Sequence, residues 1–465
     1  MKRLSSGIAL ALALFAAAPA LAQTVAITNV TLALGDGSEP IAEATVVMRD
    51  GRIVAAGRGV AVPANAENID ARGKWAAPGM VSGLSRLGLT ELEIGGDGAD
   101  DVENGASPFS AAIDVSPGVN PLTNTVAASR AGGVTRAIIA PAAARSIFAG
   151  QGAVIDLGAD MSPITRARAF QYVELGEEGA DKAGGSRPSA YALFRNALRE
   201  ARELGGMRQD ISGGGGNEAL PKQGDDSPPE TRQDPRLTGR DARRSQDVLL
   251  TRFDAAALVP VVRGRQLMVV HVERAIDIVN LIALRREFPA LRMAIAGASE
   301  GWTVARELAA SGMWVFAEPL SDLPASFEQL AATQSNIGRL RAAGVKVAIA
   351  RLGDTRYARN ERQAAGNLVA LRGVPGASAV SWGEALAMIT SRPAEAIGLV
   401  GEIGRLSAGY RADVVLWSGD PLENASVAEA VWIDGVRQPI TNHQTKLRDR
   451  YRVLDRRDLP EAYRR

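Results

Sequence analysis

Few residues of this 465-residue sequence can act through a side-chain nitrogen or sulfur that titrates near neutrality, because it contains only two histidines and no cysteine. His271 stands at the end of the apolar run VVHV, where a strand-like segment gives way to a helical one. Asp354, Arg86 and Arg351 also follow apolar runs. An imidazole or a carboxylate at such a position transfers protons, and a guanidinium binds carboxylates and oxyanions. We therefore predict His271, Asp354 and Arg86 as catalytic residues, and Arg86 and Arg351 as the residues that bind an anionic ligand.

Each of these candidates also has a structural interpretation. His271 could be a buried histidine that is hydrogen-bonded only to support the fold. Asp354 lies in the tripeptide GDT, which is a good capping sequence for a following turn. Arg86 could form a salt bridge with Glu91, Glu93 or Asp354. These alternatives remain open at the level of the sequence.

The elements that must position these residues alternate along the central part of the chain. Short runs rich in β-branched residues predict strands, and amphipathic segments between them, such as 273–288 and 299–312, predict helices. Repeated βα units over more than ~250 residues favour a (β/α)₈ TIM-type barrel, with a doubly wound parallel sheet as the second choice. The predicted strands are 133–141, 266–272, 291–297, 313–319 and 345–351.

Both ends of the chain predict β structure. Alternating apolar residues surround the hairpin signals Asp50-Gly51 near the N-terminus and Asp434-Gly435 near the C-terminus. We expect the two ends to form one small β-sandwich, with the barrel inserted between them. The predicted organisation is a signal peptide at 1–22, β-sandwich segments at 23–76 and 401–440, a barrel at 77–400 with a Gly-, Pro- and charge-rich surface insertion at 205–246, and a tail at 441–465.

The N-terminus carries the pattern of a cleavable signal peptide. Lys2 and Arg3 precede an apolar run that is too short to span a bilayer, and Ala20-Leu21-Ala22 forms a cleavage site before Gln23. The sequence therefore predicts export to the periplasm or the medium, with no membrane span in the mature chain. The formal net charge of +1 and the aromatic content of 5% do not favour nucleic acid as a partner. A small molecule of anionic character is the expected ligand.

Several stretches resemble the amidohydrolase superfamily, in its imidazolonepropionase-like and prolidase-like branch. These are DGRIVAAG with AENIDARGKWAAPGMV, then HVERAIDIVNLI with AGASEGWTVARELAASG, and finally SWGEALAMITSRPAEAIGL with GEIGRLSAGYRADVVLWSGDPL. The resemblance implies the barrel fold with its β domain. It also implies hydrolysis of a carbon–nitrogen bond in a cyclic amide or dipeptide-like substrate, by attack of water on the carbonyl, with Asp354 shuttling the proton.

The same resemblance implies metal ligands that this sequence mostly lacks. The family motif Pro-Gly-x-x-Asp-x-His-x-His corresponds here to a stretch with Ser82 at the aspartate and Leu84 and Arg86 at the histidines, and Gly297 stands near a further ligand position. Two histidines in the whole chain exclude the family's usual binuclear site.

Two states of the site remain open. One holds no metal. The other holds a single zinc-like ion on His271, Asp354 and one of Glu91, Glu93 or Glu273, with Arg86 opposing the ion electrostatically. The chain is accordingly either a hydrolase with a degenerate metal site or a catalytically inactive barrel that binds a small anionic ligand or a protein partner.

Overall fold

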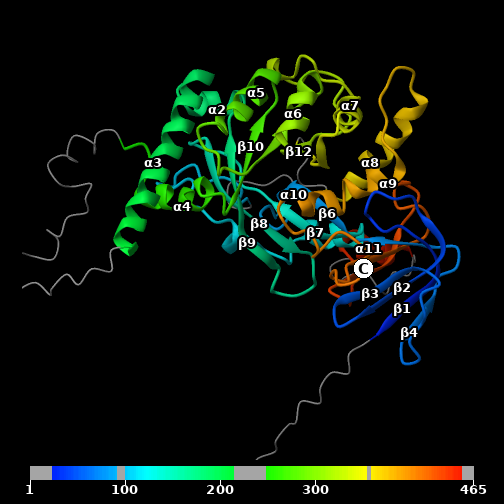
Figure 1. The fold of residues 1–465 in the computed structure, drawn as a ribbon. Coiled ribbons are helices and arrows are strands. Elements are labelled where there is room, and N and C mark those ends of the chain that lie inside the picture. Colours follow the sequence, from blue (N-terminus) through cyan, green and yellow to red (C-terminus); the bar gives the residue numbers. More distant parts are fainter. Residues whose placement is uncertain (1–23, 92–99, 214–247, 353–357, 453–465) are drawn as a thin grey trace, which may run out of the picture.

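The computed structural model describes residues 24–91, 100–213, 248–352 and 358–452, with side chains of α3 described up to residue 206. Asp354, Glu93, the predicted signal peptide and most of the predicted insertion lie outside these ranges. The described chain forms a barrel-like α/β body and a separate β-sheet body beside it (Figure 1). The predicted barrel with a β domain is therefore confirmed.

Strands from both ends of the chain hydrogen-bond into one eight-stranded sheet in the order β16-β15-β14-β5-β1-β2-β3, with β4 pairing with β1. β5 and β14 join the two ends as an antiparallel pair. The bounds of these strands are β1 Val25–Leu32, β2 Ile41–Arg49, β3 Arg52–Arg58, β4 Glu67–Asp70, β5 Trp75–Pro78, β14 Val414–Trp417, β15 Ala428–Ile433 and β16 Val436–Gln438.

The two predicted hairpin turns are present in this sheet. Asp50 and Gly51 connect β2 to β3 with φ values of 52° and 72°, and Asp434 and Gly435 connect β15 to β16 with φ values of 51° and 74°. Two consecutive residues with positive φ match the twist of the flanking strands, and Asp-Gly tolerates that conformation best. The local sequence therefore determines both turns.

The second sheet, also of eight strands, curls into a nearly closed barrel in the order β13-β12-β11-β10-β9-β8-β7-β6. All five strands predicted for this region from their apolar runs are present. The bounds are β6 Met80–Ser85, β7 Val134–Ile139, β8 Phe148–Asp156, β9 Ile164–Glu174, β10 Leu267–Val272, β11 Met293–Gly297, β12 Trp314–Ala317 and β13 Lys346–Ile349.

One strand departs from the expected all-parallel arrangement. β8 runs antiparallel to both β7 and β9, whereas the other neighbouring strands of this sheet are parallel. Because β8 returns directly after β7, its N-terminus lies at the same end of the barrel as the carboxyl ends of the parallel strands. The loop before β8 therefore belongs to the face where barrel enzymes build their sites.

The edges of the barrel sheet meet at Gly83 of β6. A Cβ atom at this position would lie 2.3 Å from the carbonyl oxygen of Ile349 in β13, well inside van der Waals contact. Only glycine permits this approach, so Gly83 allows the two edge strands to close the barrel. The interior is filled by a cluster of apolar side chains that includes Leu84, Val269 and Phe316.

Helices cover the outside of the barrel and connect it to the sheet body (Figure 1). α9 packs against loops of the sheet body, where the indole nitrogen of Trp382 donates a 2.9 Å hydrogen bond to Asp420. No helix in the described ranges is both long and apolar enough to cross a bilayer. The helix bounds are α1 Asn124–Ala131, α2 Glu177–Lys182, α3 Arg187–Gly213, α4 Arg252–Val262, α5 Ala275–Leu284, α6 Ala305–Ser311, α7 Asn336–Ala342, α8 Glu361–Ala370, α9 Trp382–Ala387, α10 Ser391–Ala396 and α11 His443–Arg452.

The predicted boundaries need one change. α3 continues to Gly213, so the start of the segment predicted as a surface insertion, from residue 205, is helical. The helix has an apolar side packed into the core through Phe194, Leu198 and Ala201, which carries it past the point where the sequence turns polar.

A buried arginine links the barrel to the sheet body. The Arg136 side chain of β7 is 1% exposed, and its Nε lies 2.8 Å from Asp413 Oδ2 while Nη2 lies 2.8 Å from Asp434 Oδ2. Burial alone would lower the pKa of Arg136, but the charges and hydrogen bonds of Asp413 and Asp434 raise it above the ordinary value for arginine. This cation therefore stays ionised and holds the two bodies together.

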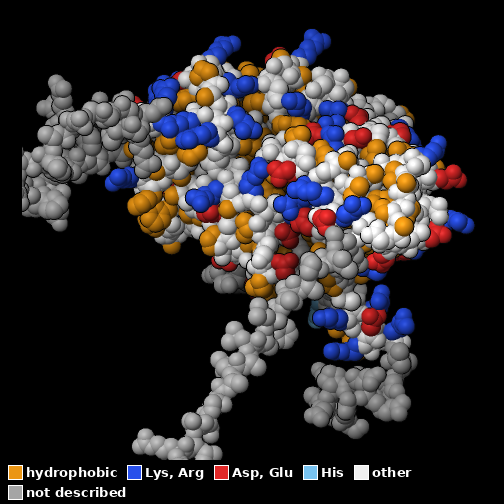
Figure 2. Space-filling model, turned by 60° about the horizontal axis from the view of Figure 1, so that its bottom comes forward, with side chains coloured by type: hydrophobic (Ala, Val, Ile, Leu, Met, Phe, Trp, Pro, Cys, Tyr) orange, Lys and Arg blue, Asp and Glu red, His pale blue; other side chains and the backbone are white. Residues whose placement is uncertain are grey.

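On the face seen in Figure 2, basic and acidic side chains are interspersed. This agrees with the formal net charge of +1.

Candidate functional site

Glu174, His271 and Glu273 form a hydrogen-bonded cluster at the carboxyl ends of β9 and β10. His271 and Glu174 are direct partners across the parallel pair of strands. The His271 Nδ1 atom lies 2.9 and 2.8 Å from the two carboxylate oxygens of Glu174, and its Nε2 lies 3.2 Å from Glu273 Oε1. The three side chains are mostly buried, with 19%, 8% and 5% exposure for His271, Glu174 and Glu273.

The two carboxylates keep the imidazole of His271 protonated. Burial by itself would lower the pKa of His271, but attraction to Glu174 and the hydrogen bonds to Glu174 and Glu273 raise it well above the ordinary value. Burial would raise the pKa of Glu273, yet its hydrogen bond and charge interaction with His271 lower it. The cluster therefore consists of an imidazolium between two carboxylates at neutral pH.

Glu273 occupies space that a side chain at Gly297 would fill. A Cβ atom at Gly297, which has a φ of 90°, would lie 2.7 Å from the Glu273 carboxyl carbon and Oε1. The carboxylate is fixed there by the Ser299 amide, which donates at 2.8 Å, and by the Gln329 side chain, which donates at 3.2 Å. At the position where the family resemblance implies a ligand, the chain has a glycine and a neighbouring carboxylate takes its place.

Tyr172 of β9 and Arg86, which follows β6, lie at the same end of the barrel as the Glu174–His271–Glu273 cluster. We call this end, where the parallel strands have their carboxyl ends, the barrel mouth. Burial raises the pKa of Tyr172 to about 12, and the charges of His271, Glu174, Arg86 and Glu273 all act on its phenol. The phenol therefore stays neutral and can donate a hydrogen bond at any physiological pH.

The end of β6 presents one apolar and one cationic side chain. Leu84 is 2% exposed and packs into the barrel interior, with a φ of 50° that is unusual for leucine. The Arg86 guanidinium has no hydrogen-bond or ion-pair partner among the described residues. The salt bridge to Glu91 considered above is not formed, because Glu91 instead accepts a hydrogen bond from Asn120.

The remaining predicted residues lie after β13 or outside the described ranges. The Nε of Arg351 is 3.8 Å from Glu318 Oε1. Asp354 and Glu93 lie outside the described ranges, so their predicted roles remain predictions. His443 begins α11, beyond the last strand of the sheet body.

A second buried carboxyl lies beneath the mouth. Ser82 of β6 donates a 2.5 Å hydrogen bond to Glu361 Oε1 at the start of α8, and both side chains are buried. Burial raises the pKa of Glu361 to about 8, in spite of opposing contributions from the Ser82 hydrogen bond and the Arg351 charge. Glu361 is therefore mostly protonated at neutral pH.

The described residues do not fit the metal centre that the resemblance implies. Leu84 and Gly297 offer no donor atoms, Arg86 brings a positive charge, and both nitrogens of His271 are hydrogen-bonded to carboxylates. Within ranges 24–91, 100–213, 248–352 and 358–452, no three His, Asp or Glu side chains are arranged to hold a metal ion.

Sequence reasoning identified His271 and Arg86 but did not identify Glu174, Tyr172, Gln329 or Glu361. The sequence signal for Glu174 and Tyr172 is the segment FQYVELG, an apolar run that ends in a carboxylate shortly before a glycine. That run is β9, which was not among the predicted strands. Gln329 and Glu361 come from loops and helix starts, whose approach to the mouth depends on the fold.

Residues 292–437 match the model of the amidohydrolase family. Among curated proteins, the chain is 43% identical to the amidohydrolase tasK of Hapsidospora irregularis over 54 residues, 12% of this chain. It is also 32% identical to a dihydroorotase of Anaeromyxobacter sp. (strain K) over 173 residues, 35% of this chain. The chain spans only 6% and 35% of the lengths of these two relatives.

A solved structure resembles the fold of this chain over most of its length. The amidohydrolase from Thermotoga maritima MSB8 superposes with a TM-score of 0.74 at 23% identity, covering 89% of this chain and 99% of that one. This likeness concerns the fold, whereas the family match concerns the sequence from the start of β11 to β16. Residues 292–437 therefore resemble the amidohydrolase family in sequence, and the chain resembles an amidohydrolase in fold.

Proposed function

We propose that this protein hydrolyses an amide-type carbon–nitrogen bond in a cyclic amide or dipeptide-like substrate that carries an anionic group. The match of residues 292–437 to the amidohydrolase family supports hydrolase function. The observation that carries the proposal is the Glu174–His271–Glu273 cluster, because it combines a proton donor and proton acceptors at the carboxyl ends of barrel strands.

The proposed chemistry uses only groups of this chain. A carboxylate of the mouth accepts a proton from the attacking water, and Asp354 is the predicted acceptor with Glu273 as the described alternative. Arg86 and the Tyr172 phenol are suited to stabilise the oxyanion that forms on the carbonyl oxygen. The His271 imidazolium then protonates the leaving nitrogen, and Glu174 stabilises its charge and orientation throughout.

The proposed site is degenerate with respect to metal. A bound cation lowers the pKa of its water from 15.7 to about 7. A site without that ion must activate the attacking water by general-base catalysis alone. We therefore expect slow turnover, resistant to chelators.

An activity screen of the chain starting at Gln23 tests this proposal. N-acetyl amino acids, dipeptides and cyclic ureides are incubated with the protein, with and without EDTA, and products are measured by mass spectrometry. We expect hydrolysis that survives EDTA and falls by about 10²–10⁴-fold in His271→Ala, the usual contribution of a general acid. The matched control His443→Ala removes the other histidine and should retain full activity. Activity that EDTA abolishes would contradict the metal-free mechanism.

The second candidate function is a catalytically inactive barrel that binds a small anionic ligand or a protein partner. The Arg86 guanidinium has no hydrogen-bond or ion-pair partner among the described residues, and both His271 nitrogens are held by carboxylates, which favours this candidate. It predicts no turnover of any substrate in the screen, together with carboxylate binding that Arg86→Met abolishes. Turnover that depends on His271 would exclude it.

We also propose that the protein is exported and cleaved near Ala22-Gln23. The basic start, apolar run and small-residue cleavage pattern support this proposal. N-terminal sequencing of the protein recovered from a periplasmic fraction should begin at Gln23. An intact N-terminus at Met1 in the cytoplasmic fraction would contradict it.

A further inference from the structure

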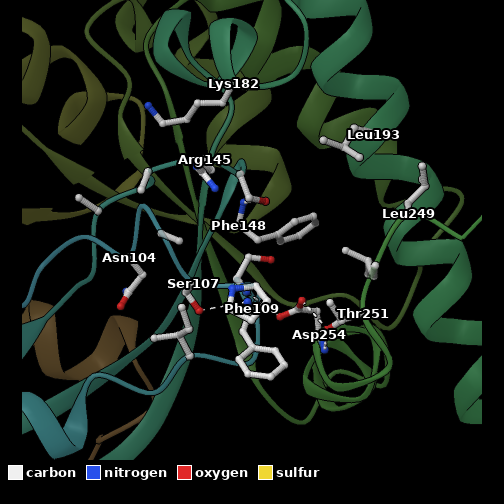
Figure 3. A pocket seen from close by; sticks show the side chains of 18 residues that line it. Asn104, Ser107, Phe109, Arg145, Phe148, Lys182, Leu193, Leu249, Thr251 and Asp254 are labelled. Atoms are coloured by element: carbon white, nitrogen blue, oxygen red, sulfur yellow. Dashed lines mark hydrogen bonds between the residues drawn. The ribbon is translucent and has the colours of Figure 1, made fainter.

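A pocket separate from the Glu174–His271–Glu273 cluster lies on the same face of the barrel. It has a volume of about 260 Å³ and is built from the segment between β6 and α1, the loop between β7 and β8, helices α2 and α3, and the segment that leads into α4 (Figure 3). Because β8 is antiparallel, the loop that precedes it, which holds Arg145, and its first residue, Phe148, contribute to this face.

Two cations define one end of the pocket. In the view of Figure 3, Lys182 and Arg145 lie at one end and Phe109 at the other. The Lys182 side chain is only 19% exposed, and its ion-pair contact, at 3.9 Å, is with Glu178, whose own side chain is 76% exposed. Arg145 has no hydrogen-bond or ion-pair partner within the part of the chain that the structure describes. The positive charge at this end is therefore weakly compensated.

The carboxylate of Asp254, which also lines the pocket, accepts hydrogen bonds from neighbouring residues. Asp254 is 2% exposed, and its Oδ1 accepts from the amides of Ser110 and Ala112 at 2.8 Å each. Its Oδ2 accepts from the Thr251 hydroxyl at 2.7 Å. The carboxylate thus shapes the loop that carries Phe109 and has its charge offset by three donors, so the cations dominate the electrostatics toward a ligand.

The rest of the wall is apolar and partly aromatic. Phe148 is 2% exposed and packs on Phe194 with ring centroids 6.2 Å apart, so it is a rigid part of the wall. Phe109 is 41% exposed and meets Phe253 edge-on at 5.6 Å. Leu193 and Leu250 complete the apolar side. A volume slightly below the usual range of about 300–1,000 Å³ for small-molecule sites fits a ligand with a single ring.

We propose that this pocket binds a small carboxylate with an aromatic or branched apolar group, its carboxylate between Lys182 and Arg145 and its apolar part against Phe109 and Phe148. Charge-assisted hydrogen bonds to the two cations supply the preference for an anion. The apolar wall supplies the preference for a hydrophobic group. This assignment does not depend on the proposed hydrolysis, because it concerns residues outside the Glu174–His271–Glu273 cluster.

Calorimetric titration with 3-phenylpropionate tests the assignment, with 3-phenylpropionamide and acetate as matched probes that lack the charge or the ring. We expect 3-phenylpropionate to bind at least about tenfold more tightly than either, because each probe loses one of the two contributions. The double variant Lys182→Met with Arg145→Met keeps both apolar stems and should lose about tenfold or more in affinity for 3-phenylpropionate. Phe109→Ser, at an exposed position, should weaken 3-phenylpropionate but not acetate.

Arg86→Met is the control that separates this pocket from the other anion-binding candidate. Binding of 3-phenylpropionate that is unchanged in Arg86→Met and weakened in the Lys182/Arg145 variant supports the assignment. Equal affinity for acetate and 3-phenylpropionate, unchanged binding in the double variant, or loss of binding in Arg86→Met would each overturn it. Hydrolytic activity is not a readout of this test, so failure here leaves the proposed function to its own experiment.

Discussion

At the scale of single residues, Gly297 and Glu273 depend on each other. The carboxylate of Glu273 reaches His271, Ser299 and Gln329 only because Gly297 has no side chain in its way. A histidine at position 297 would displace this carboxylate and remove one of the two groups that hold the imidazolium. The glycine at 297 therefore leaves the space that the glutamate at 273 needs.

The variant Gly297→Ala tests this dependence. The new Cβ atom should push the Glu273 carboxylate from its place, which lowers the pKa of His271 and destabilises the fold by about 1–3 kcal/mol beyond the strain of positive φ. Gly312→Ala is the matched control, because Gly312 also has a positive φ, 68°, but nothing within 4 Å of its Cβ position. The control should cost only about 1–2 kcal/mol of backbone strain in urea unfolding. Equal losses of stability in the two variants would contradict the account of Gly297.

Glu361 predicts a pH dependence of stability. Its pKa is raised from the ordinary 4.5 to about 8 in the folded protein. Between these two values the unfolded chain releases the proton that the folded chain retains, so stability falls as pH rises through this window and then levels off. Glu361→Gln keeps a neutral side chain of the same shape and should remove this fall, on the order of a few kcal/mol. Urea unfolding at several pH values between 5 and 9 measures it, and parallel pH profiles for the two proteins would refute the assignment.

The sequence indicated part of this site for a physical reason. His271 was predicted because it stands near the end of the apolar run VVHV, and Arg86 because it stands at a histidine position of the family motif; both signals are local in the sequence. Glu174 is the direct partner of His271 across the pair β9 and β10, and such a pairing depends on which strands are neighbours and in which register. Gln329 and Glu361 approach the mouth from positions distant in sequence, so no local pattern could reveal them.

At the scale of elements, the parallel strands were the predictable part. β7, β10, β11, β12 and β13 are buried on both faces and therefore appear as continuous apolar runs. β8 was not among the predicted strands, and Gly150 and Gly152 interrupt its sequence. Both glycines lie close to neighbouring backbone atoms and leave no room for a side chain. A Cβ atom at Gly152, for example, would lie 2.6 Å from the Ile139 carbonyl oxygen. Their role is visible only once β8 is placed beside β7.

Closure of the barrel at Gly83 gives a prediction at this scale. Gly83→Ala forces β6 and β13 apart, because its Cβ would lie 2.3 Å from the backbone oxygen of Ile349, which cannot rotate away. We expect a loss of about 1–3 kcal/mol or more, as for other overpacked sites. Gly105→Ala, with nothing near its Cβ position, is the control and should change stability by no more than about 0.5 kcal/mol. Thermal and urea unfolding measure both, and a Gly83→Ala variant as stable as its control would contradict the closure at this residue.

At the scale of the whole molecule, the two chain ends and the barrel form one interdependent structure. The Asp-Gly hairpins and alternating strands of both ends predicted a shared β domain, and its strands do join in one sheet. The sequence did not indicate that Arg136 would connect this sheet to β7, because a buried cation in an apolar run is recognised only with its acidic partners in place.

Replacement of Arg136 tests this connection. Arg136→Met leaves Asp413 and Asp434 without their main cation, and breaking such a buried pair costs about 3–5 kcal/mol. Arg72→Met is the matched control, because Arg72 and its partner Asp70 are exposed and 3.8 Å apart, so solvent screens their pair and its loss should hardly change stability. We expect a much lower urea midpoint for Arg136→Met than for Arg72→Met. Similar midpoints would show that the connection does not depend on this charge.

The central claim, that the mouth holds an imidazolium between two carboxylates in place of a metal, is tested most directly by nitrogen NMR of the histidine side chains. The chain has only two histidines, and His443→Gln leaves the signals of His271 alone. The account predicts that both ring nitrogens of His271 remain protonated well above pH 6.5, and that neither added Zn²⁺ nor EDTA changes their shifts. A neutral His271 at pH 7, or one nitrogen whose shift moves on addition of Zn²⁺, would contradict it.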